Sequence, residues 1–125
     1  MTGPVTGLDH AFITLAASGE DDGRAFYGGL LGLEEIPRPS GIAESPGLWF
    51  RVGGGELHLG VDEAHAASER PHPGFRVESV SALEELARRL EAAGCEVRWD
   101  ERIEGRRRFY TRDPSGNRVE LLADL

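Results

Sequence analysis

The chain has 125 residues, of which 39% are hydrophobic and 29% charged, a size and composition typical of one globular domain. Its net charge of -8 argues against a general binder of nucleic acid or of an anionic membrane, although its 14 basic residues are all arginine. It has no apolar run of about 18 residues, and Met1–Pro4 lacks the basic and apolar pattern of a signal peptide. With a lone Cys95, these features predict a cytoplasmic protein that does not associate with membranes.

The first half of the chain reads as strand, helix, strand, strand, strand. Three glycines inside the helix weaken it, so we expect packing against the strands to hold it in place. Three consecutive glycines mark the turn of the final hairpin. The predicted elements are a strand at Leu8–Ala16, a helix at Glu20–Leu31, a strand at Glu34–Pro37, and hairpin strands at Leu48–Val52 and Glu56–Val61.

The second half repeats this order. An offset of 62 residues, the separation of His10 from His72, also places His58 on Glu120. The helix of this half starts with a predicted capping box at Ser81–Glu84. The later strands are predicted at Glu96–Asp100, Arg107–Arg112 and Arg118–Ala123, with a turn at Asp113–Asn117 between the last two.

The repeat predicts an α+β fold built from two pseudo-symmetric βαβββ units. The units cover about residues 5–62 and 70–125 of a single domain (1–125), and a linker at Asp62–Pro71 joins them. We expect their curved mixed sheets to form a half-barrel or a full barrel around a cleft.

Strand alternation distinguishes the sheet face that packs on the helix from the opposite face, where we expect the functional residues. Apolar residues at every second position of Glu56–Val61 must face the helix, which leaves His58 on the opposite face. The same rule places Glu120, His10 and His72 on that opposite face. Three histidines and one glutamate at equivalent places in two units predict a metal site with these four residues as ligands.

Residues that share this face are predicted to form the walls of a pocket. In the first hairpin we expect the apolar residues Leu48, Phe50 and Val52 beside His58, and in the second we expect arginines and a tyrosine beside Glu120. An apolar wall and an arginine-rich wall predict a small substrate with an apolar body and adjacent anionic or carbonyl oxygens. The predicted substrate-binding residues are Phe12, Leu48, Phe50, Arg76, Arg108, Arg112 and Arg118.

Three segments, Leu8–His10, Phe26–Leu33 and Phe109–Glu120, carry a resemblance that spans the chain. In them the sequence resembles the vicinal oxygen chelate superfamily, which includes glyoxalase I, bleomycin-resistance proteins, fosfomycin-resistance proteins and extradiol dioxygenases. The resemblance implies a metal held by the first and last strands of each unit. It also implies a homodimer, with the site built within one chain or across two.

For chemistry, the resemblance implies a divalent metal (Fe, Zn, Ni, Mn or Co) held by His10, His72 and Glu120, with His58 as a fourth ligand or a neighbouring group. The expected function is a metal-dependent lyase, isomerase or dioxygenase acting on a small molecule, with Glu120 and Tyr110 as catalytic residues. His58 stands where glyoxalase I has a second glutamate, and the absence of lysine counts against fosfomycin resistance. The alternative is a metal-free protein that sequesters a ligand, as bleomycin-resistance proteins do.

Overall fold

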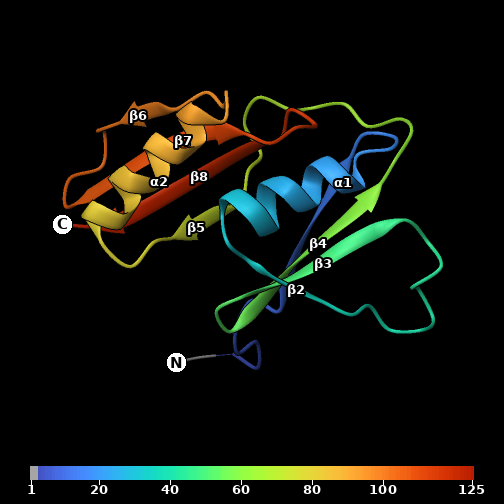
Figure 1. The fold of residues 1–125 in the computed structure, drawn as a ribbon. Coiled ribbons are helices and arrows are strands. Elements are labelled where there is room, and N and C mark those ends of the chain that lie inside the picture. The colour runs from blue at the N-terminus through green and yellow to red at the C-terminus, as the bar shows by residue number, and fades with distance from the viewer. Residues whose placement is uncertain (1–2) are drawn as a thin grey trace. The chain divides into compact units, whose positions relative to one another are not determined.

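The computed structural model describes residues 3–125; Met1 and Thr2, with which the predicted domain begins, lie outside the described residues (Figure 1). The chain divides into two compact units, Met1–His65 and Ala66–Leu125, called unit 1 and unit 2 below. Each unit contains a four-stranded mixed sheet and a helix, which confirms the predicted α+β fold. Both sheets are open, and they are not closed into a full barrel.

Unit 1 has the predicted order of elements. Its sheet has the strand order β1-β4-β3-β2, with β1 parallel to β4 and the other neighbours antiparallel. The elements are β1 (His10–Leu15), α1 (Glu20–Gly23), the π-helical segment η1 (Arg24–Leu30), β2 (Glu34–Ile36), β3 (Gly47–Val52) and β4 (Gly55–Val61).

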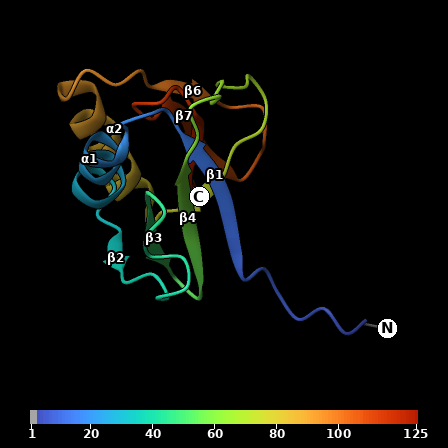
Figure 2. The same ribbon diagram turned by 90° about the vertical axis from the view of Figure 1, so that its right-hand side faces the viewer.

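The predicted helix of unit 1 is a short α-helix that continues into the wider turns of η1. At its end, the N–H of Leu31 donates to the carbonyl of Phe26, five residues earlier. A Cβ at Gly23 would lie 3.0 Å from Leu15 Cδ1, and one at Gly28 would lie 3.4 Å from the Phe50 ring. These glycines therefore allow the helix to lie close against the sheet, where both α1 and η1 contact β3 (Figure 2).

Unit 2 repeats the topology with the strand order β5-β8-β7-β6 and the same pattern of parallel and antiparallel pairs. Its helix is capped by Ser79, whose hydroxyl accepts from the N–H of Ala82 at 3.1 Å. The capping box predicted at Ser81–Glu84 is therefore wrong, because the helix begins just before it. The elements are β5 (Gly74–Arg76), α2 (Val80–Ala92), β6 (Arg98–Asp100), β7 (Arg106–Arg112) and β8 (Arg118–Asp124).

Each core lies between one face of a sheet and the helix of the same unit. In both units the apolar side chains of the central strands alternate toward the helix and lose almost all of their solvent exposure. The opposite face of each sheet is left to carry polar and aromatic side chains. The largest fully buried side chains are Leu15, Phe26, Tyr27, Leu48, Phe50, Leu57 and Leu59 in unit 1, and Leu83, Leu90, Phe109, Val119 and Leu121 in unit 2.

Candidate functional site

The non-helical face of unit 1 brings His10 and His58 together. In the parallel pair of β1 and β4, Phe12 lies opposite His58, and His10 points to the same side two residues earlier. The two imidazole rings are stacked, with centroids 4.2 Å apart. On its other side the His58 ring stacks on Trp49 at 3.6 Å, so aromatic rings cover both of its faces. Phe12, predicted to bind substrate, lies on this face and is 61% exposed.

Acidic neighbours orient both histidines. Nδ1 of His10 is 2.8 Å from a carboxylate oxygen of Asp9, and Nε2 of His58 is 2.8 Å from one of Glu56. Because a carboxylate accepts, each of these nitrogens donates, and in a neutral ring the second nitrogen is the acceptor. In His10 this acceptor is Nε2, and a carboxylate behind the ring is the usual support of a metal-binding imidazole.

The predicted apolar wall of unit 1 is wrong. Trp49, rather than Leu48 or Phe50, lies opposite His58 in the antiparallel pair of β3 and β4. Leu48 and Phe50 face the helix and are 1% and 0% exposed, so they belong to the core. Val52, also expected beside His58, lies on the same side of β3 as Leu48 and Phe50, opposite Gly55.

The reason for this error is the length of the hairpin turn. The turn between β3 and β4 has two residues, Gly53 and Gly54, and an even number pairs odd positions with even ones. The turn between β7 and β8 has five, so Tyr110 pairs with Glu120, as predicted. The two-residue glycine turn is the signal that could have placed Trp49 beside His58.

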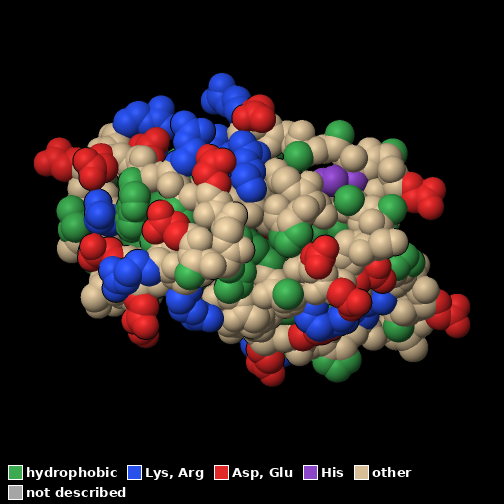
Figure 3. All heavy atoms as spheres, turned by 45° about the horizontal axis from the view of Figure 1, so that its top comes forward, with side chains coloured by type: hydrophobic (Ala, Val, Ile, Leu, Met, Phe, Trp, Pro, Cys, Tyr) green, Lys and Arg blue, Asp and Glu red, His purple; other side chains and the backbone are tan. Residues whose placement is uncertain are grey.

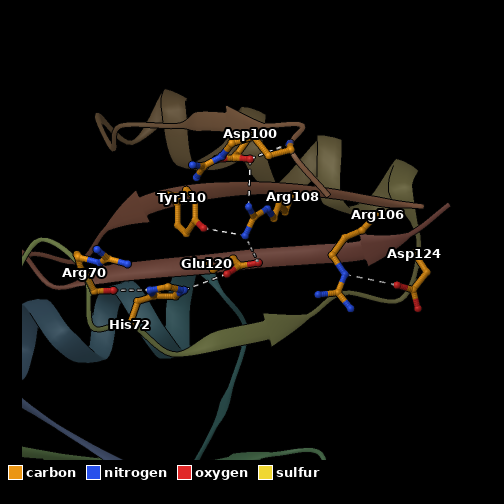
Figure 4. A network of polar contacts seen from close by, with 9 residues as sticks. Arg70, His72, Asp100, Arg106, Arg108, Tyr110, Glu120 and Asp124 are labelled. Atoms are coloured by element: carbon orange, nitrogen blue, oxygen red, sulfur yellow. Dashed lines mark hydrogen bonds and ion pairs between the residues drawn. The ribbon is translucent and has the colours of Figure 1, made fainter. Parts of the chain in front are cut away.

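On the non-helical face of unit 2, His72 contacts Glu120 (Figure 4). Nδ1 of His72 donates to the backbone carbonyl of Arg70 at 2.7 Å, because a carbonyl can only accept. Nε2 lies 3.0 Å from Oε1 of Glu120, and in a neutral ring it would carry the lone pair. In a neutral ring two acceptors would therefore face each other, and either a proton on Nε2 or a shared cation satisfies this contact.

Arg108 lies at the centre of the polar network in Figure 4. Its Nη1 donates to Tyr110 Oη at 2.7 Å and to Glu120 Oε2 at 3.4 Å, and its Nη2 donates to Asp100 Oδ1 at 3.1 Å. The residue is only 8% exposed, and its Nε has no hydrogen-bond partner among residues 3–125. Arg108, predicted to bind substrate, thus contacts both residues predicted to be catalytic.

Asp100 is a part of the network that the sequence analysis missed. The side chain and the backbone N–H of Arg102 both donate to it, and these hydrogen bonds hold the pKa of Asp100 well below its usual range. Register alone explains its position, because Asp100 lies opposite Arg108 in the pair of β6 and β7. Asp100 therefore stays ionised and balances the charge of Arg108.

The hydroxyl of Tyr110 keeps its hydrogen for a further partner. Its oxygen accepts from Arg108, so the phenolic hydrogen remains available as a donor. The guanidinium of Arg118 lies 3.7 Å over the ring, and the edge of His72 contacts it at a centroid distance of 5.3 Å. Arg76 lies on the same sheet face, but its guanidinium is paired with Asp124 at 2.7 Å.

Neither unit by itself brings together a complete set of metal ligands among the described residues. Among residues 3–125 no three His, Cys, Asp or Glu side chains gather closely enough to hold an ion, and each unit contributes a pair of candidates. Two ligands about 2.1 Å from one ion at a right angle lie about 3 Å apart, which fits the His72–Glu120 separation of 3.0 Å. The spacing of His72 and Glu120 thus fits two ligands of one ion, and it also fits a hydrogen-bonded ion pair.

Comparisons with known proteins show the family and the fold. The model of the glyoxalase/bleomycin resistance protein/dioxygenase superfamily matches residues 7–121. An uncharacterized protein of Pseudomonas aeruginosa is 37% identical over 107 residues, which cover 78% of this chain and 75% of that protein. The crystal structure of a glyoxalase family protein from Bacillus anthracis is 35% identical and covers 100% of both chains, with a TM-score of 0.91.

A third comparison extends the likeness of fold. A variant of the fosfomycin resistance protein FosX from Listeria monocytogenes, in complex with Mn(II) and 1S,2S-dihydroxypropylphosphonic acid, has a TM-score of 0.79 at 23% identity. The match covers 97% of this chain and 94% of FosX. In residues 3–125 no helix has the length and apolar character needed to cross a membrane. The resemblance drawn from the sequence is confirmed: the chain belongs to the glyoxalase/bleomycin resistance protein/dioxygenase superfamily.

Proposed function

We propose that the protein is a metal-dependent enzyme that acts on a small anionic molecule with two adjacent oxygens, as a lyase, isomerase or dioxygenase. The contact between His72 and Glu120 carries the proposal, because two acceptors facing each other at 3.0 Å are both satisfied by a shared cation. His10, with Asp9 behind its Nδ1, is the third proposed donor. Bound to one ion, these three residue types would make a two-histidine, one-carboxylate set, which leaves positions open for substrate oxygens.

His58 is proposed as a supporting neighbour of this set. Its Nε2 donates to Glu56 and its ring is sandwiched between His10 and Trp49, which fixes the orientation of His10. The proposed metal is one of Fe, Zn, Ni, Mn or Co, and the Mn(II) complex of FosX supports a divalent ion of this group. When bound, such an ion would act as a Lewis acid toward the substrate oxygens.

The residues around the proposed site supply the proton chemistry. Glu120 takes a proton from the substrate at Oε2, the oxygen that does not contact His72. Arg108 holds that oxygen in place and also fixes the hydroxyl of Tyr110. Tyr110 then donates its hydrogen to the oxygen on which negative charge develops. Phe12 and Trp49 would contact the apolar body of the substrate.

A second function is favoured by the contact of Arg108 with Glu120. A buried carboxylate needs an opposite charge, and this guanidinium supplies one without any metal. In that case the protein would bind and sequester a small ligand on the same sheet faces. His72 and Glu120 would then maintain the fold and hold the ligand, and no reaction would follow.

Metal titration separates the two functions. We expect purified protein to contain a divalent metal by elemental analysis and, after chelation, to bind Mn(II) or Zn(II) in calorimetry. His72→Ala and Glu120→Gln should lose this binding, whereas the control His65→Ala should retain it, because His65 lies outside the proposed donor set. Wild-type protein without measurable metal binding, or Glu120→Gln with wild-type affinity, would overturn the proposed enzyme.

The homodimer is proposed from the family resemblance and tested in solution. Sedimentation should give twice the mass of the chain. The variants His10→Ala and Glu120→Gln can then be unfolded together and refolded as mixed dimers. Recovery of part of the metal binding would indicate sites that draw on two chains, and no recovery in a confirmed mixed dimer would indicate sites within one chain.

A further inference from the structure

A cavity of about 210 Å³ in unit 2 lies beside Tyr110, on the side of β6 and β7. Four arginines and three acidic residues line it, and side chains of these two kinds lie side by side on the surface in Figure 3. At about 30 Å³ for each water molecule, the cavity has room for about seven waters. This volume suits a small organic acid or the acidic end of a larger molecule.

Two of the arginines lie directly opposite each other. Arg112 in β7 pairs with Arg118 in β8, so their side chains leave the sheet on the same face as Tyr110 and Glu120. Two like charges in this position repel each other unless oxygens lie between them or around them. The site thus presents two guanidinium groups to anything that enters the cavity.

Oxygen atoms of the chain itself accept hydrogen bonds from these two arginines. Arg112 donates through Nη1 to the carbonyls of Ser68 and Gly116, at 3.2 and 3.3 Å, and through Nη2 to the carboxylate of Glu69 at 3.2 Å. Arg118 donates to the backbone carbonyl of Glu69 at 2.9 Å. Glu69, from the linker, therefore takes up part of the hydrogen-bonding capacity of Arg112 and Arg118.

The interaction that keeps the Glu69 carboxylate at Arg112 is weak. The side chain of Glu69 is 92% exposed, and its ion pair with Arg112 is a single contact. Exposed pairs of this kind contribute little to stability, so an outside anion can replace Glu69. The other acidic residues of the cavity are already paired within β6 and its flanks, Asp100 with Arg102 and Glu96 with Arg98.

We propose that Arg112 and Arg118 form a subsite for the carboxylate of a small organic acid, and that Glu69 is its intramolecular competitor. The inference rests on the proposed function, since it locates the anionic group of the same substrate. The contacts that carry it involve no metal ligand. The subsite therefore binds anions in the metal-free protein as well.

The test uses the whole chain after chelation. Acetate is titrated at constant ionic strength and followed by NMR, through the side-chain N–H signals of the arginines and the backbone signals around Tyr110. We expect saturable shifts in wild-type protein and an affinity about two- to fivefold higher in Glu69→Gln, where the competitor is lost. Arg112→Gln and Arg118→Gln should each bind at least about tenfold more weakly.

The control variant is Arg51→Gln, which removes an exposed arginine of unit 1 that pairs with Glu34. It should bind acetate as wild-type protein does. Shifts that do not saturate, or an affinity unchanged in Glu69→Gln, would overturn the proposal. Tighter binding of inorganic phosphate than of acetate would overturn the assignment to carboxylates.

The same samples separate this inference from the proposed function. Wild-type protein that binds acetate but no divalent metal would refute the metal-dependent enzyme and leave the subsite standing. Wild-type protein that binds metal, with acetate affinity unaffected in Arg112→Gln, would refute the subsite alone.

Discussion

Arg108 and Glu120 form a buried ion pair on the non-helical face of unit 2, with Nη1 3.4 Å from Oε2 and both side chains less than a tenth exposed. Removing water from two charges is costly, and the pair is stable because Arg108 also donates hydrogen bonds to Tyr110 and Asp100. The loss of either partner would leave a buried charge without compensation.

Arg108→Gln should therefore lower the free energy of unfolding by about 3–5 kcal/mol. Urea denaturation followed by circular dichroism measures this change. The matched control is Arg51→Gln, whose exposed ion pair with Glu34 should contribute no more than about 1 kcal/mol. Equal losses in the two variants would contradict the central role of Arg108.

The lowered pKa of Asp100 predicts that the free energy of unfolding depends on pH in the acid range. Hydrogen bonds from Arg102 hold its pKa well below the ordinary value, so the folded state favours the ionised form. Such a group stabilises the fold above its unfolded pKa, about 3.9, and this contribution disappears as the pH falls toward the lower folded pKa.

Asp100→Asn should thus lose stability at neutral pH and show a smaller further decrease between about pH 5 and pH 2 than wild-type protein does. Thermal unfolding across this range measures the difference. Glu63→Gln, in the linker, should retain the wild-type dependence. A parallel decrease in wild-type protein and Asp100→Asn would count against the prediction.

Gly47 should tolerate no side chain. A Cβ at this position would collide with the backbone carbonyl of Leu59 in the neighbouring strand, which cannot move away without breaking the sheet. We expect Gly47→Ala to cost at least about 1–3 kcal/mol in unfolding measurements. Gly54→Ala is the control, because a Cβ there meets nothing within 4 Å; equal costs would show that the strands adjust freely.

The observed orientation of β3, with Leu48 in the core and Trp49 beside His58, leads to a further prediction. Leu48→Ala should lower the free energy of unfolding by about 2–5 kcal/mol, because it opens a cavity in the core of unit 1. Trp49→Ala removes a stacked ring from a partly exposed position, and we expect a loss of about 0.5–1.5 kcal/mol. Denaturation of both variants tests this, and the reverse order would indicate that Trp49 belongs to the core.

Strand alternation predicted the fold and much of the candidate site. It placed His72, Tyr110 and Glu120 on one sheet face, where the structure brings them together, because alternation depends only on the local backbone. It also placed His10 and His58 on one face of unit 1. The pairing between these positions across the two units stays a prediction.

Contacts that depend on register and side-chain length could not be read in the same way. Leu48 and Phe50 were assigned to the wrong face because alternation within a strand does not say which residue lies opposite in its partner. The contact of Arg108 with Asp100 depends on where β6 begins, and that of Arg112 with Glu69 depends on the path of the linker. The glycine turn could have corrected the first of these errors, but no local pattern encodes the two arginine contacts.

The two-residue turn at Gly53 and Gly54 restricts how the chain can change in evolution. Exposed hairpin tips usually accept insertions at little cost. Here one added residue would shift β3 against β4, turn Trp49 inward and expose Phe50. Relatives that keep the ring stacked on His58 must therefore change the length of this hairpin by two residues at a time, or compensate with a bulge.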